Sequence, residues 1–313
     1  MSNPSTNPTA AIVARGLAKR FEDVVAVDGL DLEVRRGECF GLLGPNGAGK
    51  TTTIEILEGL TDPDGGEVEV LGRSWKDGGR ELRERMGISL QETQLIEKLT
   101  VGETIRLFRS FYTKGREPQE VLARLSLDEK VNSRVGRLSG GQKQRLAVAC
   151  ALVCDPEILF LDEPTTGLDP QSRLQLWEQI LEFRAGGGTI LLTTHYMDEA
   201  ERLCDRVAIV DRGKVIALGT PAELISSLHA ASVIEFACEP ELSEETLRTL
   251  PGVGEIHRRG PNLCLAVASL TETVPQLLAL IEKRGSRLAH LSTHNATLED
   301  LFVARTGRAL RED

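Results

Sequence analysis

The sequence contains no apolar run long enough to cross a membrane as a helix. Apolar runs such as Ile190-Leu191-Leu192 have the length of a strand, whereas a membrane-spanning helix needs about 18–20 residues. Residues 1–10 hold no basic residue and no apolar core, so they do not resemble a secretory signal and are expected to form a disordered tail. These absences favour a cytoplasmic chain.

The sequence also lacks paired cysteines and an excess of positive charge. Its six cysteines form no CxxC pair and no Cys/His cluster with zinc spacing, so we expect buried thiols in a reducing compartment. The chain carries 37 Lys and Arg against 47 Asp and Glu, for a net charge of −10. Because nucleic-acid binding relies on cationic contacts to phosphate, we expect no nucleic-acid partner. The cysteines are Cys39, Cys150, Cys154, Cys204, Cys238 and Cys264.

The 313 residues predict about two domains, of which the first alternates strands and helices. Buried strands are predicted at 39–43, 158–161 and 189–193, and helices at 50–59 and 172–184. An antiparallel hairpin is predicted over 12–34, and residues 92–137 are predicted to be mostly helical. Strand–helix alternation is typical of an α/β domain with a largely parallel sheet. We place this domain at 11–228, with a mixed sheet and a helical subdomain at about 92–155.

The pattern changes after Gly219-Thr220-Pro221, where a small α+β domain is predicted at 231–313. The order of its predicted strands and helices is βαββαβ followed by a final helix, which indicates a ferredoxin-like fold. The strands are predicted at 233–238, 253–257, 263–268 and 287–293, and the helices at 243–250, 273–283 and 298–305.

A glycine-rich segment between a predicted strand and a predicted helix carries the strongest chemical signal. The segment matches the pattern GxxxxGK[ST] of a P-loop, in which backbone N–H groups turn inward around nucleotide phosphates. A plain glycine turn before a helix is the alternative, but both flanks have the context that a P-loop requires. Lys50 would contact the β- and γ-phosphates, Thr51 would ligate Mg²⁺, and Thr52 would add a phosphate contact. The segment is Gly44, Pro45, Asn46, Gly47, Ala48, Gly49, Lys50 and Thr51.

Two acidic residues end the predicted strand over 158–161. Ligand sites in α/β sheets lie at the carboxyl ends of strands, so Asp162 would hold the Mg²⁺ shell and Glu163 would polarise the attacking water. An apolar strand that ends in Asp-Glu is commonplace by itself. Its pairing with a P-loop favours the catalytic interpretation.

The pentapeptide Leu138-Ser139-Gly140-Gly141-Gln142 opens a predicted helix at about Gly141 and distinguishes among nucleotide hydrolases. With this motif the sequence resembles the ATP-binding subunit of an ABC transporter, and the resemblance runs from Phe21 to Glu223 with every motif in order.

The resemblance implies further roles. Gln91 fits the Q-loop and would reach Mg²⁺ and the water, Asp169 fits the D-loop, and His195 fits the switch histidine that contacts the γ-phosphate or positions the water. Phe21 matches the aromatic residue that stacks on adenine. The remaining histidines lack such context and receive no role; they are His229, His257, His290 and His294.

We call the pentapeptide 138–142 the signature motif, and it would form a second phosphate-binding helix terminus. Within one chain, this terminus and the P-loop cannot both bind the same γ-phosphate if they lie on opposite subdomains. The resemblance therefore implies that two chains pair head-to-tail around two MgATP. Each chain would supply Ser139, Gly140, Gly141, Gln142 and Asp169 to the partner's site.

The resemblance is closest to exporter ATPases whose permease is a separate chain, of the drug, polysaccharide and nodulation-factor type. It implies an ATPase that drives a multi-spanning permease and lies at the inner face of the cell membrane through that permease. The alternative is a soluble ABC ATPase that remodels a ribosome, DNA or an assembly complex. The single cassette, the absence of sustained heptads and the acidic composition all disfavour it.

Overall fold

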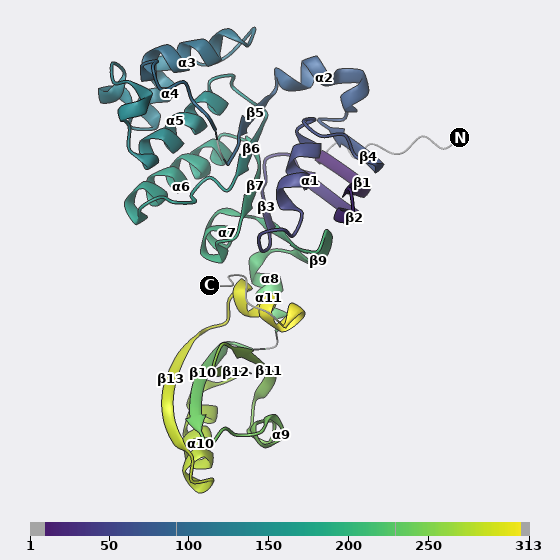
Figure 1. The fold of residues 1–313 in the computed structure, drawn as a ribbon, viewed down its shortest axis with the longest axis vertical. Coiled ribbons are helices and arrows are strands. Elements are labelled where there is room, and N and C mark those ends of the chain that lie inside the picture. Colours follow the sequence, from purple (N-terminus) through teal and green to yellow (C-terminus); the bar gives the residue numbers. More distant parts are fainter. Residues whose placement is uncertain (1–9, 92, 229, 308–313) are drawn as a thin grey trace. The chain divides into compact units, whose positions relative to one another are not determined.

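The computed structural model describes residues 10–91, 93–228 and 230–307 and divides into two compact units (Figure 1). The first unit ends at Val215 and the second begins at Ile216, within strand β9 (Lys214–Gly219). The change of unit thus comes earlier in the chain than the domain limits of 228 and 231 drawn from the sequence. Strand β1 begins at Ala10, so most of the expected tail, 1–9, lies outside the described residues.

A six-stranded sheet organises the first unit, in the order β5-β6-β7-β3-β8-β9. Strands β5 to β8 of this order pair in parallel, which confirms the largely parallel sheet. Every residue of β3, β6 and β7 is buried, because both faces of a parallel sheet are covered. The strands are β3 (Cys39–Leu43), β5 (Met86–Ser89), β6 (Ile158–Asp162), β7 (Thr189–Thr194) and β8 (Arg206–Asp211).

A separate antiparallel sheet, β2-β1-β4, is formed by β1 (Ala10–Phe21), β2 (Val24–Arg35) and β4 (Gly65–Val70). Its first two strands are the predicted hairpin, turning at residues 22–23. One apolar core joins this sheet, the six-stranded sheet and helix α1 (Lys50–Leu57). The P-loop helix is therefore held between two sheets.

The segment predicted to be mostly helical, 92–137, holds less helix than expected. It contains α3 (Val101–Ser110), α4 (Pro118–Arg124) and two short 3-10 turns. The backbone after α4 bonds back to the start of α3 instead of continuing a helix: the amides of Val101 and Gly102 donate to the carbonyls of Ser133 and Val131. The first unit's other helices are α2 (Trp75–Arg83), α5 (Gly140–Leu152), α6 (Pro170–Ala185) and α7 (Met197–Leu203).

The second unit contains a four-stranded antiparallel sheet in the order β11-β12-β10-β13. Its apolar core lies between this sheet and helices α9 and α10, and helix α11 contacts β11 and α8. The strands are β10 (Ser232–Glu239), β11 (Val253–Arg259), β12 (Asn262–Val267) and β13 (Arg287–Asn295). The helices are α8 (Pro221–Ser226), α9 (Glu244–Leu247), α10 (Leu270–Lys283) and α11 (Leu298–Thr306).

All six cysteines are buried and free, as the sequence predicted. Across the described segments, no helix combines the length and the hydropathy that a membrane crossing needs.

Candidate active site

The P-loop connects buried strand β3 to helix α1 through a backbone that requires glycine. Gly44, Gly47 and Gly49 have φ values of 155°, 77° and 100°, which L side chains rarely adopt. A Cβ on Gly49 would lie 2.2 Å from the carbonyl oxygen of Ala26, so no side chain fits there. Helix α1 begins directly after this loop, at Lys50. The first-turn N–H groups of α1 therefore face the loop with the positive end of the helix dipole.

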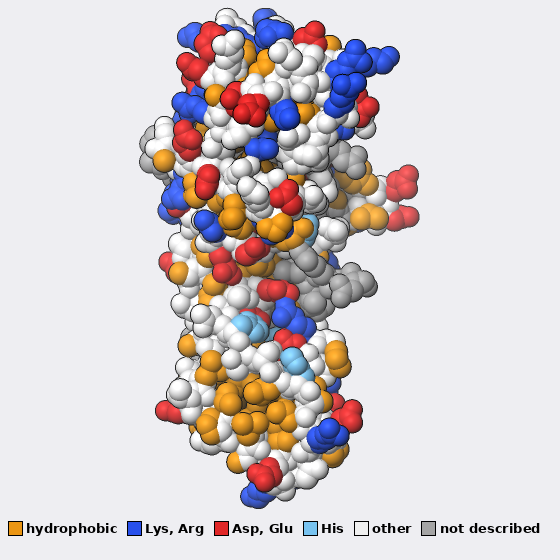
Figure 2. All heavy atoms as spheres, turned by 90° about the vertical axis from the view of Figure 1, so that its left-hand side faces the viewer, with side chains coloured by type: hydrophobic (Ala, Val, Ile, Leu, Met, Phe, Trp, Pro, Cys, Tyr) orange, Lys and Arg blue, Asp and Glu red, His pale blue; other side chains and the backbone are white. Residues whose placement is uncertain are grey.

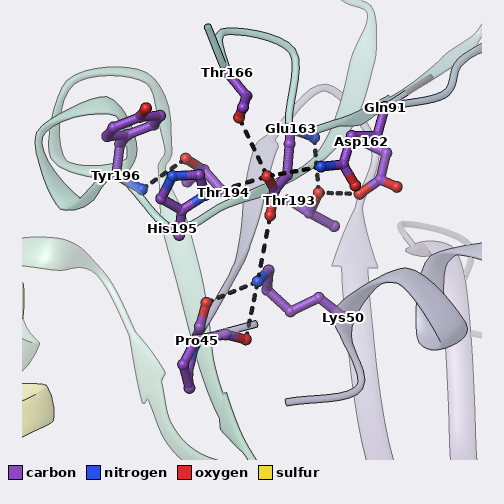
Figure 3. Close-up of polar contacts among 11 residues, drawn as sticks. Pro45, Lys50, Gln91, Asp162, Glu163, Thr166, Thr193, Thr194, His195 and Tyr196 are labelled. Carbon is purple, nitrogen blue, oxygen red and sulfur yellow. Dashed lines mark hydrogen bonds and ion pairs between the residues drawn. The ribbon is translucent and has the colours of Figure 1, made fainter. Parts of the chain in front are cut away.

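Lys50 points back across this loop (Figure 3). Its side chain is 4% exposed, and its Nζ donates to the carbonyl oxygens of Gly44 (2.7 Å) and Pro45 (3.2 Å). The same Nζ lies 3.5 Å from Oε1 of Glu163. Burial lowers the pKa of Lys50, and the Glu163 carboxylate opposes that shift. The lysine is thus a buried cation whose contacts include backbone carbonyls that a bound anion could replace.

Asp162 ends strand β6 and is buried against the neighbouring strand β7. The Oγ1 of Thr193 donates to Asp162 Oδ1 and accepts from the amide N of Glu163 at 2.9 Å. Burial raises the pKa of Asp162, and the Thr193 hydrogen bond acts against the shift. No role was predicted for Thr193, although its place at the end of a predicted parallel strand, two residues before His195, was an available signal. Thr193 fixes the positions of both acidic residues.

Glu163 is the centre of the polar contacts drawn in Figure 3. Its Oε2 lies 3.2 Å from Nδ1 of His195 and accepts from Thr166 Oγ1 at 3.2 Å and from Gln91 Nε2 at 3.4 Å. The neighbouring His195 side chain, together with the Lys50 charge, lowers the pKa of Glu163 even though burial acts in the opposite direction. Glu163 is therefore a carboxylate at neutral pH. We call Lys50, Gln91, Asp162, Glu163 and His195 the Lys50–Glu163 cluster.

Three further predicted site residues have other surroundings. Phe21 ends β1 with 48% of its surface exposed, and Lys19 Nζ lies 5.3 Å from its ring centroid. Thr51 is exposed and Thr52 is half-buried in the first turn of α1. Among the hydrogen bonds and ion pairs of the described residues, none joins any of these three to the Lys50–Glu163 cluster.

The signature motif begins helix α5. Ser139 caps this helix, and Gln142 completes a reciprocal capping box with it. Asp169 caps α6 in a similar way by accepting from Ser172. The two helix starts are close, because a Cβ on Gly141 would lie 2.7 Å from Ser172 Oγ. In the described part of the chain, the polar contacts of these caps stay local and do not reach the Lys50–Glu163 cluster.

Glu58 is a buried carboxyl group that the sequence analysis missed. It ends helix α1 with 1% of its surface exposed, and within the described residues neither side-chain oxygen has a hydrogen-bond partner. Burial, with smaller contributions from the Asp162 and Glu55 charges, raises the pKa of Glu58 to about 8. A Glu in a predicted helix gives no sequence signal for such burial.

Glu58 is expected to make the protein less stable as the pH rises. The unfolded chain releases the Glu58 proton near pH 4.5 and the folded chain near pH 8, so the free energy of unfolding falls between these values. Glu58→Gln removes this titration. Between pH 5 and pH 9, the free energy of unfolding of this variant should therefore rise by roughly a few kcal/mol relative to that of wild type. Urea unfolding at both pH values measures the difference. Glu97→Gln, at an exposed position, is the control, and its stability should depend on pH as that of wild type does. If the stability of Glu58→Gln also kept the wild-type pH dependence, the raised pKa assigned to Glu58 would be wrong.

Comparisons with known proteins identify the family of this chain. A family model described as "ABC transporter" matches residues 27–166. A curated protein of Burkholderia lata named "Nod factor export ATP-binding protein I" is 41% identical over 311 residues, covering 97% of this chain and 100% of that protein. The chain belongs to the ATP-binding subunits of ABC transporters. The resemblance found in the sequence is thereby confirmed.

Solved structures of this ABC family share the fold of the cassette. A structure titled "Structure of ATP binding subunit of ABC transporter" has a TM-score of 0.64 and 31% identity, covering 70% of this chain and 93% of that chain. A bacterial ABC transporter cassette described as dimeric has a TM-score of 0.62 and 27% identity, covering 67% of this chain and 98% of that chain. This ABC subunit is an ATPase that couples ATP hydrolysis to transport.

Proposed function

We propose that this subunit is the motor of an exporter, in which two copies close around two ATP molecules and drive a separate permease. One observation carries the proposal. Glu163 is held as a carboxylate between Lys50 and His195 at the P-loop, whereas the side-chain hydrogen bonds of Ser139 and Gln142 within the described residues join these two residues to each other. One chain thus provides a base and a phosphate-binding loop, and a second chain would provide the missing helix terminus. The relative solved as a dimeric cassette supports this pairing.

The proposed mechanism divides ATP between two chains. The P-loop N–H groups and Lys50 bind the β- and γ-phosphates, Thr52 adds a contact, and Phe21 stacks on adenine. Glu163 takes the proton of the attacking water, while His195 orients that carboxylate and contacts the γ-phosphate. The second chain contacts the γ-phosphate from the other side through Ser139, Gly140 and Gly141. Gln142 and Asp169 of that chain lie beside these three residues.

The oxygen atoms of Asp162, Thr51 and Gln91 suit Mg²⁺, which prefers oxygen ligands from a few protein groups and from phosphates. The Asp162 carboxylate, the Thr51 hydroxyl and the Gln91 amide oxygen would hold the ion. Asp162 is 2% exposed and rigidly placed by Thr193, as a ligand to a small cation must be. When bound, Mg²⁺ supplies neutralisation of charge on the phosphates.

Gly141→Asp tests the two-chain site. A Cβ at this position already lies 3.0 Å or less from Ser172 Oγ and Cβ, and a carboxylate at this helix start would repel a phosphate. We expect ATP binding by the monomer to stay within about threefold of wild type, which also shows that the variant is folded. We expect turnover to fall at least about 100-fold, as for loss of a group that stabilises transition-state charge. ATP-dependent dimerisation and turnover at wild-type levels would contradict the shared site.

Export through a membrane permease is favoured because several relatives of this length are named for Nod factor export. We propose that the exported cargo contacts the permease and not this chain. The subunit would lie at the inner face of the membrane through that permease. A remodelling ATPase without a membrane partner remains the competing function.

Co-purification decides between these two functions. The Glu163→Gln variant is tagged, expressed in its native cell and purified from mild-detergent extracts in ATP, which should hold the closed dimer. We expect a multi-spanning permease in stoichiometric amount. A ribosome or a water-soluble assembly complex in place of the permease would mean that the motor serves another process.

The order of strands and helices in the second unit supports the proposal that a ferredoxin-like accessory domain begins near residue 231. Its order of elements is β10-α9-β11-β12-α10-β13, and its sheet order is β11-β12-β10-β13 with every neighbour antiparallel. This is the arrangement expected of a split βαβ fold. We propose 11–228 as the cassette, including a helical subdomain at about 92–155, and 231–313 as the accessory domain.

A further inference from the structure

His195 lies in the short connection between strand β7 and helix α7. The strand ends at Thr194 and the helix begins at Met197, so His195 and Tyr196 form the connection. The amide of Tyr196 donates to Thr194 Oγ1 at 2.9 Å, which holds the backbone on both sides of His195. The imidazole lies 3.2 Å from Glu163 through Nδ1. One contact at one nitrogen does not fix the plane of a ring, so the direction of the imidazole depends on its other neighbours.

The ring of Tyr196 is one of these neighbours. The centroids of the His195 and Tyr196 rings are 4.2 Å apart, with an angle of 37° between the ring planes. Figure 3 shows the Tyr196 ring beside the imidazole and away from Glu163. Arg173 of helix α6 contacts the same tyrosine ring, with its Cζ 4.7 Å from the ring centroid. Arg173, Tyr196 and His195 therefore form a series of contacts, which we call the Arg173–His195 stack.

The contact with the tyrosine ring explains the position of Arg173 better than ion pairing does. Arg173 lies 3.6 Å from Asp198, whose side chain is 62% exposed, and exposed pairs of this kind contribute little. Figure 2 shows basic and acidic side chains scattered over the first unit, so a surface ion pair is not unusual there. The buried Nε of Arg173 has no hydrogen-bond partner among the described residues. An aromatic ring, in contrast, attracts a guanidinium group that lies over it.

A buried hydrogen bond fixes helix α7 against helix α6 beside this stack. The indole N–H of Trp177 donates to Glu199 Oε1 at 3.0 Å, and both side chains are buried. Trp177 follows Arg173 by four residues in α6, and Glu199 follows Tyr196 by three residues at the start of α7. Residues at these spacings lie on the same side of a helix. The hydrogen bond therefore fixes the register that places Arg173 against Tyr196.

We propose that Arg173 and Tyr196 are positioning residues that hold the imidazole of His195 in the direction that ATP hydrolysis needs. The inference deepens the proposed function and rests on the role given there to His195. With Nδ1 toward Glu163, the second ring nitrogen, Nε2, points in another direction and is left for the γ-phosphate. Rotation of the ring would lose this arrangement, and small displacements of a reacting group slow the chemical step. ATP binding belongs to the P-loop and should not change.

The first test is Arg173→Gln in the full chain, which removes the cation from the tyrosine ring. We expect kcat for ATP hydrolysis to fall about 10- to 100-fold, the cost of a misplaced catalytic group, while KM for ATP stays within about threefold. Arg184→Gln is the matched control, because Arg184 is a half-buried arginine of the same helix and pairs with Asp205. Its kcat should stay within about twofold of wild type.

Two further comparisons separate positioning from a general loss of packing. On a His195→Ala background, Arg173→Gln should lower kcat by less than about twofold more, because the ring through which Arg173 acts is absent. Tyr196→Phe keeps the aromatic ring and should retain kcat within about threefold of wild type. Tyr196→Leu removes the ring and should lose about as much as Arg173→Gln.

Three results would overturn the inference: a wild-type kcat in Arg173→Gln, the full loss from Arg173→Gln on the His195→Ala background, or equal losses in Tyr196→Phe and Tyr196→Leu. The proposed role of His195 fails by a different measurement. If His195→Ala alone hydrolyses ATP at the wild-type rate, His195 has no part in the reaction, whatever the variants of Arg173 and Tyr196 do.

Discussion

Glu163→Gln is expected to bind ATP with near wild-type affinity and to hydrolyse it about 100- to 10,000-fold more slowly, the range that general-base catalysis contributes. The amide keeps the size of the side chain but cannot accept the proton of the attacking water. Its position should be preserved, because Thr193 Oγ1 accepts from the backbone amide of residue 163 and not from its side chain. With ATP, the variant should accumulate as a dimer.

The control for this variant is the same substitution at the opposite end of strand β6. Glu157 precedes β6 and makes half-exposed ion pairs with Arg85 and Arg36, remote from the carboxyl end of the strand. Glu157→Gln should retain turnover within about twofold, since exposed ion pairs contribute little. Phosphate release measures turnover, and size-exclusion chromatography with ATP measures the dimer. Turnover of Glu163→Gln within tenfold of wild type would exclude Glu163 as the base.

The Lys50–Glu163 cluster could be predicted where its residues lie in short sequence segments with a recognisable pattern. The P-loop needs glycines at fixed positions because the backbone turns through φ values of 77° to 155°, and this need is visible in the sequence. The acidic pair after β6 and the histidine after β7 follow buried apolar runs, whose parallel pairing brings their ends together. The sequence therefore predicted which residues would meet at the end of the sheet.

Elements with weak local patterns were missed. Helix α2 has two adjacent glycines, Gly78 and Gly79, in its middle, and β5 has only four residues. Neither segment offers enough periodicity to be identified alone. Thr193 and Glu58 were missed for a different reason. Their environments are created by packing between segments distant in sequence, which no local pattern encodes.

The second unit shows the same limit for surfaces. Alternation of apolar and polar residues predicted its strands, and the core is built from those apolar residues. Which strand lies at an edge depends on sheet order, and that order places β13 at an edge and β10 inside the sheet. The sequence of β13 becomes informative only once its position is known.

Lys50→Ala is expected to weaken ATP binding at least about 100-fold, which corresponds to roughly 2.7 kcal/mol and to loss of one or two charge-assisted hydrogen bonds. Lys50 Nζ now contacts the carbonyls of Gly44 and Pro45 and the carboxylate of Glu163, all of them acceptors. A bound phosphate would replace some of these contacts, so the lysine exchanges partners instead of being desolvated anew. Titration calorimetry with ATP measures the loss.

Removal of the lysine should leave the base intact. The neighbouring His195 side chain does most to lower the pKa of Glu163, and the Lys50 charge contributes less. Glu163 therefore stays ionised in Lys50→Ala, and saturating ATP should restore more turnover to Lys50→Ala than to Glu163→Gln. Lys143→Ala, at a half-buried surface lysine paired with Glu97, is the control and should bind ATP as wild type does. Unchanged ATP affinity in Lys50→Ala would contradict the phosphate-binding role of this loop. If the affinity is lost but excess ATP restores turnover, binding by Lys50 is separate from the chemistry of Glu163.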